Sequence, residues 1–296
     1  MLRIEIDMYS GRPNPSWVVD EKEAKNILDK ISKSPEAMAD MDAGRQDLGY
    51  RGIILEPLTE ELMYEYDVPA SFKLASNGSK DLAKGIDLAA EIIKKMPLDK
   101  KPAEADATAL EADLQKVVLS EIGLFSKRMA SMSAEDGPEK VSAPVDVTCY
   151  YEKTAFNPAF WNNASVISKN NCYNYATNRR TDTFAQPGRA TGCYPYPMAC
   201  DAVTKAALCD GAHKRYNCFP ATEAPRNLIA LVVWPGRDYH WYRLHSEGFW
   251  GHKPGGTAAR KTDNCGKVIY NPETCCRGSY TQFCGYFYTC KSMKVK

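Results

Sequence analysis

The stretch LIALVVWPGRDYHWYRLHSEGFWGH, residues 228–252, decides how the second half of the chain is expected to fold. It begins with a continuous apolar run, residues 228–234, which is typical of a buried central strand. The Pro-Gly pair that follows predicts a turn, and residues 239–245 then alternate like a partner strand. A glycine-rich hairpin and loop come next. The pattern therefore places His240 at the start of one strand and returns His252 beside it on the next.

Earlier in the chain, SKNNCYNYATN (residues 168–178) predicts the start of a helix with Asn170 or Asn171 as its cap. Cys172 then lies in the first turn. There the helix dipole and free N–H groups lower the pKa of a thiol and can stabilise an oxyanion. Residues 201–214 predict a shorter helix that ends at Gly211.

The 296-residue chain changes character near residue 148. Residues 1–148 hold 19 Lys and Arg against 28 Asp and Glu, a net charge of −9, whereas 149–296 hold 19 against 9, a net of +10. All eleven cysteines lie in the second half. Because residues 131–148 are rich in Ser, Pro and charge, we predict an α+β domain over 1–130, a linker over 131–148 and a cysteine-rich domain over 149–296. The opposite charges favour docking of the N-terminal domain on the C-terminal one.

The first 130 residues predict both strands and helices. Residues 2–8 alternate like a half-buried strand, and 50–57 and 62–68 read as two short strands. Asp20 is the expected cap of a first helix, and apolar stripes over 82–93 and 110–125 predict two more. We find no catalytic signature in this part.

The cysteines favour a disulfide-stapled, extracytoplasmic or secreted domain, since the second half has about one cysteine in thirteen residues. There is no Cys-x-x-Cys pair of the kind that structural zinc sites use. With an odd count, five disulfides would leave one thiol, either reactive or buried and inert. We predict that this thiol is Cys172; the alternative is that Cys172 forms half of a disulfide.

Other classes of protein fit the sequence poorly. No apolar run approaches the roughly 18 residues of a membrane span, and the basic residues are scattered rather than arranged for nucleic acid. Residues 1–17 do not read as a signal peptide, because Arg3, Glu5 and Asp7 interrupt the apolar stretch. Two sequons, at Asn77 and Asn163, matter only in a host that glycosylates.

The order of these features resembles the NlpC-type branch of the papain-like cysteine peptidases. In that family a cysteine opens a helix, an apolar strand follows, the next strand starts with the base histidine, and a polar residue returns on the following hairpin. Here NNCYNYA (170–176) and residues 228–255 carry the resemblance, which covers roughly 165–256. It implies a disulfide-rich papain-like α+β domain with Cys172 as nucleophile, His240 as general base and acid, and His252 as the orienting group.

The resemblance implies a cysteine hydrolase that cleaves an amide or peptide bond through a thioester. Peptidoglycan stem peptide is the favoured substrate, and no cofactor is implied. Two other classes stay open. One is a secreted, disulfide-stapled binding or toxin module with exposed aromatic residues as its contact surface. The other is a metal site, in which Cys172, His240 and His252 hold Zn²⁺ or copper.

Each residue also has a purely structural interpretation. On position alone, His240 fits a hydrogen-bonded core histidine as well as it fits a base. Asp263 and Asn264 fit an Asx-turn and serve only as reserve candidates for the third site residue. The remaining histidines, His213 and His245, are expected to be exposed.

Overall fold

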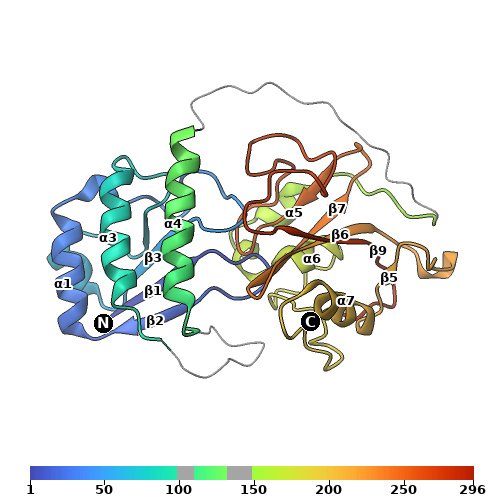
Figure 1. Cartoon of the computed structure of the whole chain (residues 1–296), viewed down its shortest axis with the longest axis horizontal. Helices are drawn as coiled ribbons and strands as arrows, with labels where there is room; N and C mark the ends of the chain where they lie inside the picture. The colour runs from blue at the N-terminus through green and yellow to red at the C-terminus, as the bar shows by residue number, and fades with distance from the viewer. Residues whose placement is uncertain (99–109, 132–148) are drawn as a thin grey trace. The chain divides into compact units, whose positions relative to one another are not determined.

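The computed structural model describes residues 1–98, 110–131 and 149–296 (Figure 1). The chain divides into two compact units, each with helices and a sheet, so the predicted mixed α+β class is confirmed. Unit 1 comprises Met1–Met8, Asn14–Gln46 and Tyr50–Asp136, and unit 2 comprises Tyr9–Pro13, Asp47–Gly49 and Gly137–Lys296. The expected linker, 131–148, lies outside the described residues apart from Ser131, and its boundaries stay a prediction.

Unit 1 is built on a four-stranded antiparallel sheet in the order β2-β1-β3-β4. Leu2, Ile4 and Ile6 are fully buried while Arg3 is exposed, which is the alternation expected of a half-buried strand. The four strands are β1 (Leu2–Asp7), β2 (Ser16–Val19), β3 (Gly52–Pro57) and β4 (Phe72–Leu74).

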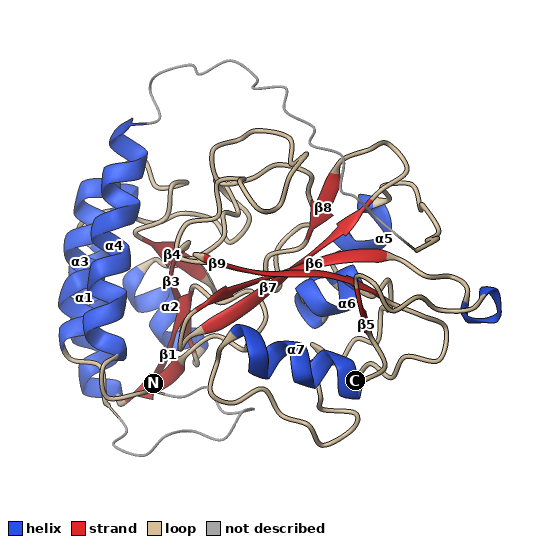
Figure 2. Ribbon diagram, turned by 45° about the vertical axis from the view of Figure 1, so that its right-hand side comes forward, coloured by secondary structure: helices blue, strands red, loops and turns tan. Residues whose placement is uncertain are grey.

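Three helices of unit 1 lie side by side: α1, α3 and α4 (Figures 1 and 2). Asp20 caps α1 as predicted, because its side chain accepts a hydrogen bond from the Glu23 backbone N–H at 2.9 Å. The helices of this unit are α1 (Glu21–Ser32), the 3₁₀ helix η1 (Pro35–Ala37), α2 (Glu60–Tyr66), α3 (Leu82–Lys94) and α4 (Leu114–Ser131).

The strand predicted over residues 62–68 is wrong, because this segment forms helix α2 and its C-cap. Two acidic residues, Glu60 and Glu61, lie in its first turn, where they favour a helix N-terminus. Asp67 adopts a left-handed conformation and ends the helix. Only one residue of the helix, Leu62, is buried, so the alternating apolar residues that suggested a strand do not form a buried face.

A buried ion cluster lies in unit 1. The carboxylate of Asp7 accepts hydrogen bonds from Arg51 at 2.6 Å and from Lys73 at 2.8 Å, and all three side chains are buried. Burial alone would raise the pKa of Asp7, but the two cations hold that pKa well below its ordinary value. The charges of this cluster therefore depend on one another.

Unit 2 contains a five-stranded antiparallel sheet in the order β5-β9-β6-β7-β8. Every residue of β6 is buried, which confirms the predicted central strand, and β7 is its predicted hairpin partner. The strands are β5 (His213–Lys214), β6 (Leu228–Trp234), β7 (Asp238–Leu244), β8 (Trp250–His252) and β9 (Gln282–Tyr288).

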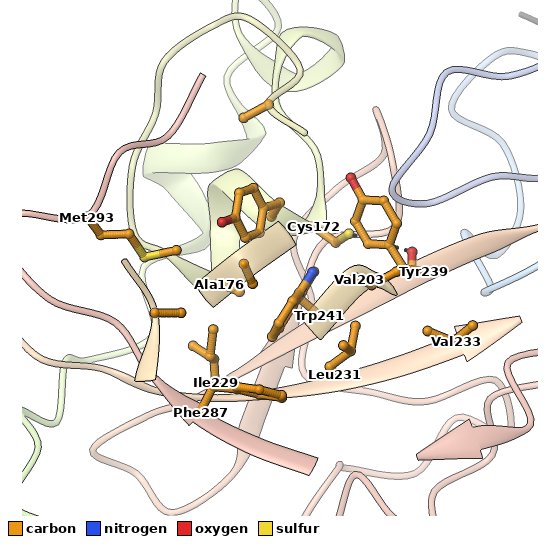
Figure 3. Close-up of a cluster of buried hydrophobic side chains, with 14 of the residues drawn as sticks. Cys172, Ala176, Val203, Ile229, Leu231, Val233, Tyr239, Trp241, Phe287 and Met293 are labelled. Atoms are coloured by element: carbon orange, nitrogen blue, oxygen red, sulfur yellow. Dashed lines mark hydrogen bonds between the residues drawn. The ribbon is translucent and has the colours of Figure 1, made fainter. Parts of the chain in front are cut away.

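The helices of unit 2 are short, and two of them, α6 and α7, pack on the sheet. Figure 3 shows Cys172 and Ala176, from α6, beside Trp241 of β7 and Ile229 and Leu231 of β6. The helices are α5 (Pro158–Asn162), η2 (Ile167–Lys169), α6 (Cys172–Ala176), α7 (Cys200–Cys209) and η3 (Ala221–Glu223).

Four disulfides stabilise unit 2, not the five expected. Both ends of α7 are cross-linked, since Cys200 is joined to β9 and Cys209 to the preceding loop. The thiols of Cys172, Cys275 and Cys290 are free, because they face Tyr239, Tyr242 and Gly211 rather than another cysteine. The disulfides are Cys149–Cys218, Cys193–Cys209, Cys200–Cys284 and Cys265–Cys276.

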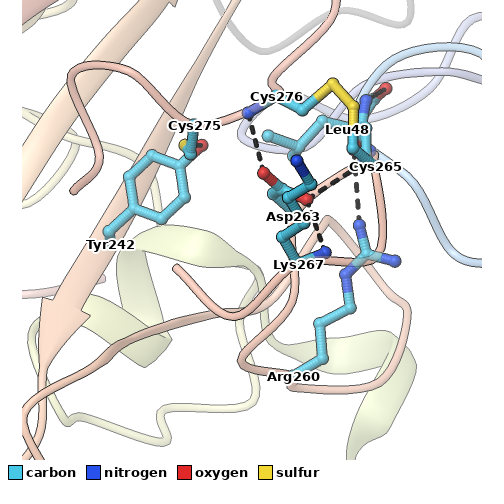
Figure 4. The surroundings of a disulfide bond; sticks show 9 residues. Leu48, Tyr242, Arg260, Asp263, Cys265, Lys267, Cys275 and Cys276 are labelled. Atoms are coloured by element: carbon cyan, nitrogen blue, oxygen red, sulfur yellow. Dashed lines mark hydrogen bonds between the residues drawn. A yellow bond between two sulfur atoms is a disulfide. The ribbon is translucent and has the colours of Figure 1, made fainter. Parts of the chain in front are cut away.

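The Asp263–Asn264 turn has a structural role beside one of these disulfides (Figure 4). The carboxylate of Asp263 accepts from the backbone N–H groups of Cys265 and Cys276, each at 2.9 Å. Asn264 exchanges two hydrogen bonds with the backbone of Leu48, at 2.7 and 2.8 Å. Asp263 and Asn264, the reserve candidates for the third site residue, therefore stabilise a disulfide-linked loop by hydrogen bonds to its backbone.

In the ranges that the structure covers, we find no helix that is both long and apolar enough to cross a membrane.

Candidate functional site

Cys172 is the first residue of α6, as the sequence predicts. The Asn171 side chain accepts from the backbone N–H groups of Tyr173 and Asn174, and the Asn174 side chain accepts from the Asn171 N–H in return. This reciprocal cap satisfies the helix N-terminus with side chains. The helix ends at Ala176, after five residues.

The surroundings of the Cys172 thiol act against its ionisation. The residue is fully buried, and its Sγ lies 3.9 Å from the backbone oxygen of Tyr239. Burial raises the pKa of Cys172 well above the ordinary value, and the neighbouring Asp238 adds to the rise. The sequence predicted a lowered pKa from the helix start. The pKa is raised instead, because removal of water destabilises the thiolate more than the helix N-terminus stabilises it.

The structure brings His240 and His252 together as predicted. His252 lies opposite Tyr242 on the neighbouring strand, and its Nδ1 is 2.8 Å from Nε2 of His240. The Thr262 carbonyl, 2.9 Å from Nε2 of His252, can only accept a hydrogen bond. The same nitrogen lies 3.2 Å from Nε of Arg260, which can only donate, so His252 Nε2 has one acceptor and one donor as neighbours. Burial, and then the nearby Arg260, lower the pKa of His252 well below its ordinary value.

The remaining nitrogen of His240 is bound by a residue that the sequence did not indicate. Ser10 Oγ lies 2.6 Å from His240 Nδ1, within hydrogen-bonding distance. The Ser10 hydroxyl also lies within hydrogen-bonding reach of Cys172. It therefore takes the position that a catalytic thiol would need beside the base. In the sequence, SGRPNPSW (10–17) reads only as a strand break, so no local signal pointed to Ser10.

The segment Tyr9–Pro13 is held in unit 2 by the buried carboxylate of Asp238. This carboxylate accepts from the backbone N–H groups of Ser10, Gly11 and Arg12 at 2.5 to 3.1 Å, and from the Tyr280 hydroxyl at 2.5 Å. A Cβ at Gly11 would overlap the ring of Tyr239, so only glycine fits this approach. The hydrogen bonds and the close packing fix Ser10 in place.

The four side chains Ser10, Cys172, His240 and His252 are all fully buried. Hydrogen bonds link Ser10 to His240 and His240 to His252, and His252 in turn contacts the Thr262 carbonyl and the Arg260 guanidinium. Among the residues that the structure describes, no three His, Cys, Asp or Glu side chains are arranged to hold a metal ion. The arrangement can act as a satisfied polar element of the core.

The other two histidines, His213 and His245, differ in burial. The prediction that His245 is exposed is wrong, because it is fully buried and its ring bonds the Tyr175 hydroxyl at 2.7 Å and the Thr154 carbonyl at 3.1 Å. Burial, reinforced by Arg243, lowers the pKa of His245 to about 4. His213 is partly exposed and stacks on Phe219.

Exposed tyrosines are a second candidate feature of unit 2. Tyr194 and Tyr196 are 51% and 66% exposed, and they lie in the loop between Cys193 and Cys200. Both of these cysteines are cross-linked, so the loop is held at each end. Aromatic rings left in water at a fixed loop are candidates for contact with a partner. The other exposed tyrosines of this unit are Tyr150, Tyr216 and Tyr270.

Comparison with known proteins gives one informative result. Insoluble matrix shell protein 1 of Ruditapes philippinarum is 49% identical to the chain over 133 residues, which are 45% of this chain and 88% of that protein. No family model matches the chain. No solved structure matches it either.

This relative contradicts the predicted cysteine hydrolase, and with it the thiol protease and NlpC-like peptidase. Its name describes a component of an insoluble matrix rather than an enzyme. The arrangement of Cys172 and His240 agrees with the correction, because the thiol is buried with a raised pKa and the base is hydrogen-bonded to Ser10. The peptidoglycan substrate, which rested on the resemblance to peptidases, loses its basis.

Proposed function

The chain belongs to the family of insoluble matrix shell protein 1, and we propose that it is a secreted, non-catalytic structural protein of an insoluble extracellular matrix. The single observation that carries this proposal is the 49% identity to that protein over most of its length. The proposal agrees with the alternative that the sequence left open, a disulfide-stapled module without chemistry.

The cross-links of unit 2 support an extracellular location. Its eight paired cysteines form four disulfides, which persist in oxidising compartments and are rare in reducing ones. A protein that stays in a matrix after secretion also benefits from cross-links, since they limit unfolding over long times.

We propose the loop 193–200 as part of the surface that contacts the matrix. Tyrosine offers a large ring with few rotatable bonds, so it makes contacts at a low cost in conformational entropy. Two prolines and two cross-linked cysteines restrict the loop further, which reduces the entropy lost on binding.

The test is a sedimentation assay with the full oxidised chain and the insoluble matrix of the organism that makes it. We expect most of the chain to pellet with the matrix, and the double variant Tyr194→Ser, Tyr196→Ser to pellet several-fold less. The matched control is Tyr64→Ser, which changes a tyrosine that is 83% exposed in unit 1. Cys172→Ala should pellet like the unchanged chain.

A chain that stays in the supernatant with the matrix would overturn the proposal of a matrix protein. Equal losses in the loop variant and the Tyr64→Ser control would leave a matrix protein but remove the loop from its contact surface.

We also propose that unit 2 has a papain-like framework that serves as a scaffold. Support comes from the order of its elements, with Cys172 opening α6 and with His240 and His252 adjacent on β7 and β8. An experimental structure of the chain, superposed on papain-like peptidases, would test it. The proposal fails if α6 and β6–β8 do not superpose together.

A further inference from the structure

The two sequons differ in their structural surroundings. Asn163 follows the last residue of α5, and Asn163, Ala164 and Ser165 are all exposed. The Asn163 Oδ1 accepts two hydrogen bonds from Ser165, one from its backbone N–H at 2.9 Å and one from its hydroxyl at 2.7 Å. No described residue accepts a hydrogen bond from the Asn163 Nδ2, which leaves this amide nitrogen open to solvent.

This geometry suits a reaction at the Asn163 amide nitrogen. When Nδ2 loses a proton, negative charge develops on Oδ1, and two donors already aimed at that oxygen stabilise it.

The second sequon, at Asn77, is engaged by its own unit. The Asn77 Oδ1 accepts from the Arg45 backbone N–H at 2.8 Å, so its hydrogen bond goes to another segment rather than to the sequon hydroxyl. Gly44 approaches so closely that a Cβ there would overlap Asn77, and a Cβ at Gly78 would overlap Ala43. The Ser79 hydroxyl is buried and donates to no atom among the described residues.

We propose that Asn163 carries an N-linked glycan and that Asn77 carries none. The inference rests on the proposed secretion, because attachment needs a lipid-diphosphate-linked oligosaccharide as co-reactant. In the transfer, Nδ2 of Asn163 forms a bond to the anomeric carbon of the sugar and loses one proton to solvent. The bond from that carbon to the diphosphate oxygen breaks, and the lipid diphosphate leaves with the electron pair.

The experiment is secretion of the full chain from a eukaryotic host that glycosylates, with intact mass measured before and after peptide-N-glycosidase treatment. We expect a mass loss of a single glycan and conversion of residue 163, but not residue 77, to aspartate. Asn163→Gln and Ser165→Ala should each abolish the mass shift, whereas Ser165→Thr should keep it. Asn77→Gln is the matched control and should leave the shift unchanged.

A secreted chain without a glycan at Asn163, or with one at Asn77, would overturn the inference. The matrix sedimentation assay separates this failure from that of the proposed function. A chain that lacks the glycan and still pellets with the matrix contradicts only the modification. Peptides from the natural protein, treated in the same way, extend the test beyond the chosen host.

Discussion

Unit 1 contains no cysteine, whereas unit 2 contains all eleven and forms four disulfides. Unit 1 packs helices of 12 to 18 residues together, α1, α3 and α4, and its interior holds the Asp7 ion cluster. Helices α5 and α6 of unit 2 have five residues each, and α7 has ten. In unit 2, cross-links and buried hydrogen bonds add to the hydrophobic core that α6 and α7 form with the sheet.

The comparison also explains why unit 2 looks like an enzyme in its sequence. Polar groups buried in unit 2 must satisfy one another, and they include histidines, asparagines and a cysteine. The same residue types build catalytic sites. Burial and partners distinguish the two uses, and in this protein they favour the structural one.

The largest expected effect comes from reduction. By loop entropy, the disulfides that span 69 and 84 residues are each worth roughly 4 to 5 kcal/mol, and those that span 16 and 11 residues about 3 kcal/mol. Reduction and alkylation should therefore unfold unit 2 and leave unit 1 folded. Hydrogen exchange read on peptides of β6 and β9 against those of β1 and β3 measures this. Alkylation without reductant is the control, and equal loss of protection in both units would contradict the comparison.

Asp7→Asn should have the next largest effect, and it should fall on unit 1. Removing the carboxylate leaves Arg51 and Lys73 buried without their anion, which typically costs about 3–5 kcal/mol. The control is Glu56→Gln, which breaks an exposed pair with Arg3 and should cost less than about 1 kcal/mol. Urea unfolding measures both changes. An Asp7→Asn variant as stable as the control would show that the ion cluster does not stabilise unit 1.

Gly11→Ala should destabilise unit 2 by about 1–3 kcal/mol, because the new methyl group overlaps the ring of Tyr239. The matched change in unit 1 is Gly123→Ala, on an exposed position of α4 with open space around it. That change should stabilise the helix by roughly 0.5–1 kcal/mol. Thermal unfolding of the two variants should therefore shift in opposite directions, and shifts of the same sign would refute the prediction.

Acid should affect unit 2 before unit 1. The pKa of His245 is lowered to about 4, so its contribution to stability is complete above the unfolded value, roughly 6.5, and is lost as the pH falls toward 4. His252, with a pKa also below its ordinary value, adds to this loss. The lowered pKa of Asp7 affects unit 1 only below about pH 4, where the unfolded carboxylate takes up a proton.

Denaturant unfolding of unit 2 between pH 7 and pH 4 measures the histidine effect. His245→Gln should flatten the dependence on pH, while His213→Gln, at a partly exposed position, should keep it. A dependence that survives His245→Gln undiminished would assign the acid sensitivity to other groups.

The smallest effect is expected from alkylating reagents on the native chain. Burial raises the pKa of all three free cysteines, of Cys275 to about 11, so none is a ready nucleophile at neutral pH. Mass spectrometry should find little label on the folded protein and three labelled cysteines after unfolding without reductant. Rapid labelling of Cys172 in the native protein would contradict this prediction, because it would show that the buried thiol becomes accessible to the reagent.

Part of the candidate site was predictable from the sequence. The apolar run 228–234 and the alternation after it placed β6 and β7, and the length of the following hairpin returned His252 to His240. The asparagine cap placed Cys172 at the start of α6. These features depend on neighbours within about a dozen residues, and hydrophobic periodicity and capping report on that range.

The position of Ser10, and of the segment Tyr9–Pro13 that contains it, was not predictable in this way. The Ser10–His240 hydrogen bond joins residues 230 positions apart, and the Asp238 carboxylate binds a segment 226 to 228 positions away. No periodic pattern reports such a contact. The seven-residue helix α2 was also missed, because its single buried residue gives no helical stripe.

The sequence by itself determined the mixed α+β class, the cysteine-rich second half, the buried strand β6 and the proximity of His240 and His252. Tertiary structure alone decided which cysteines pair, that Cys172 is buried with a raised pKa, and which sequon is exposed. The reason is that local patterns depend on backbone geometry and side-chain polarity along the chain. The ionisation of a thiol or the reach of an amide depends instead on the water removed by segments that are distant in sequence.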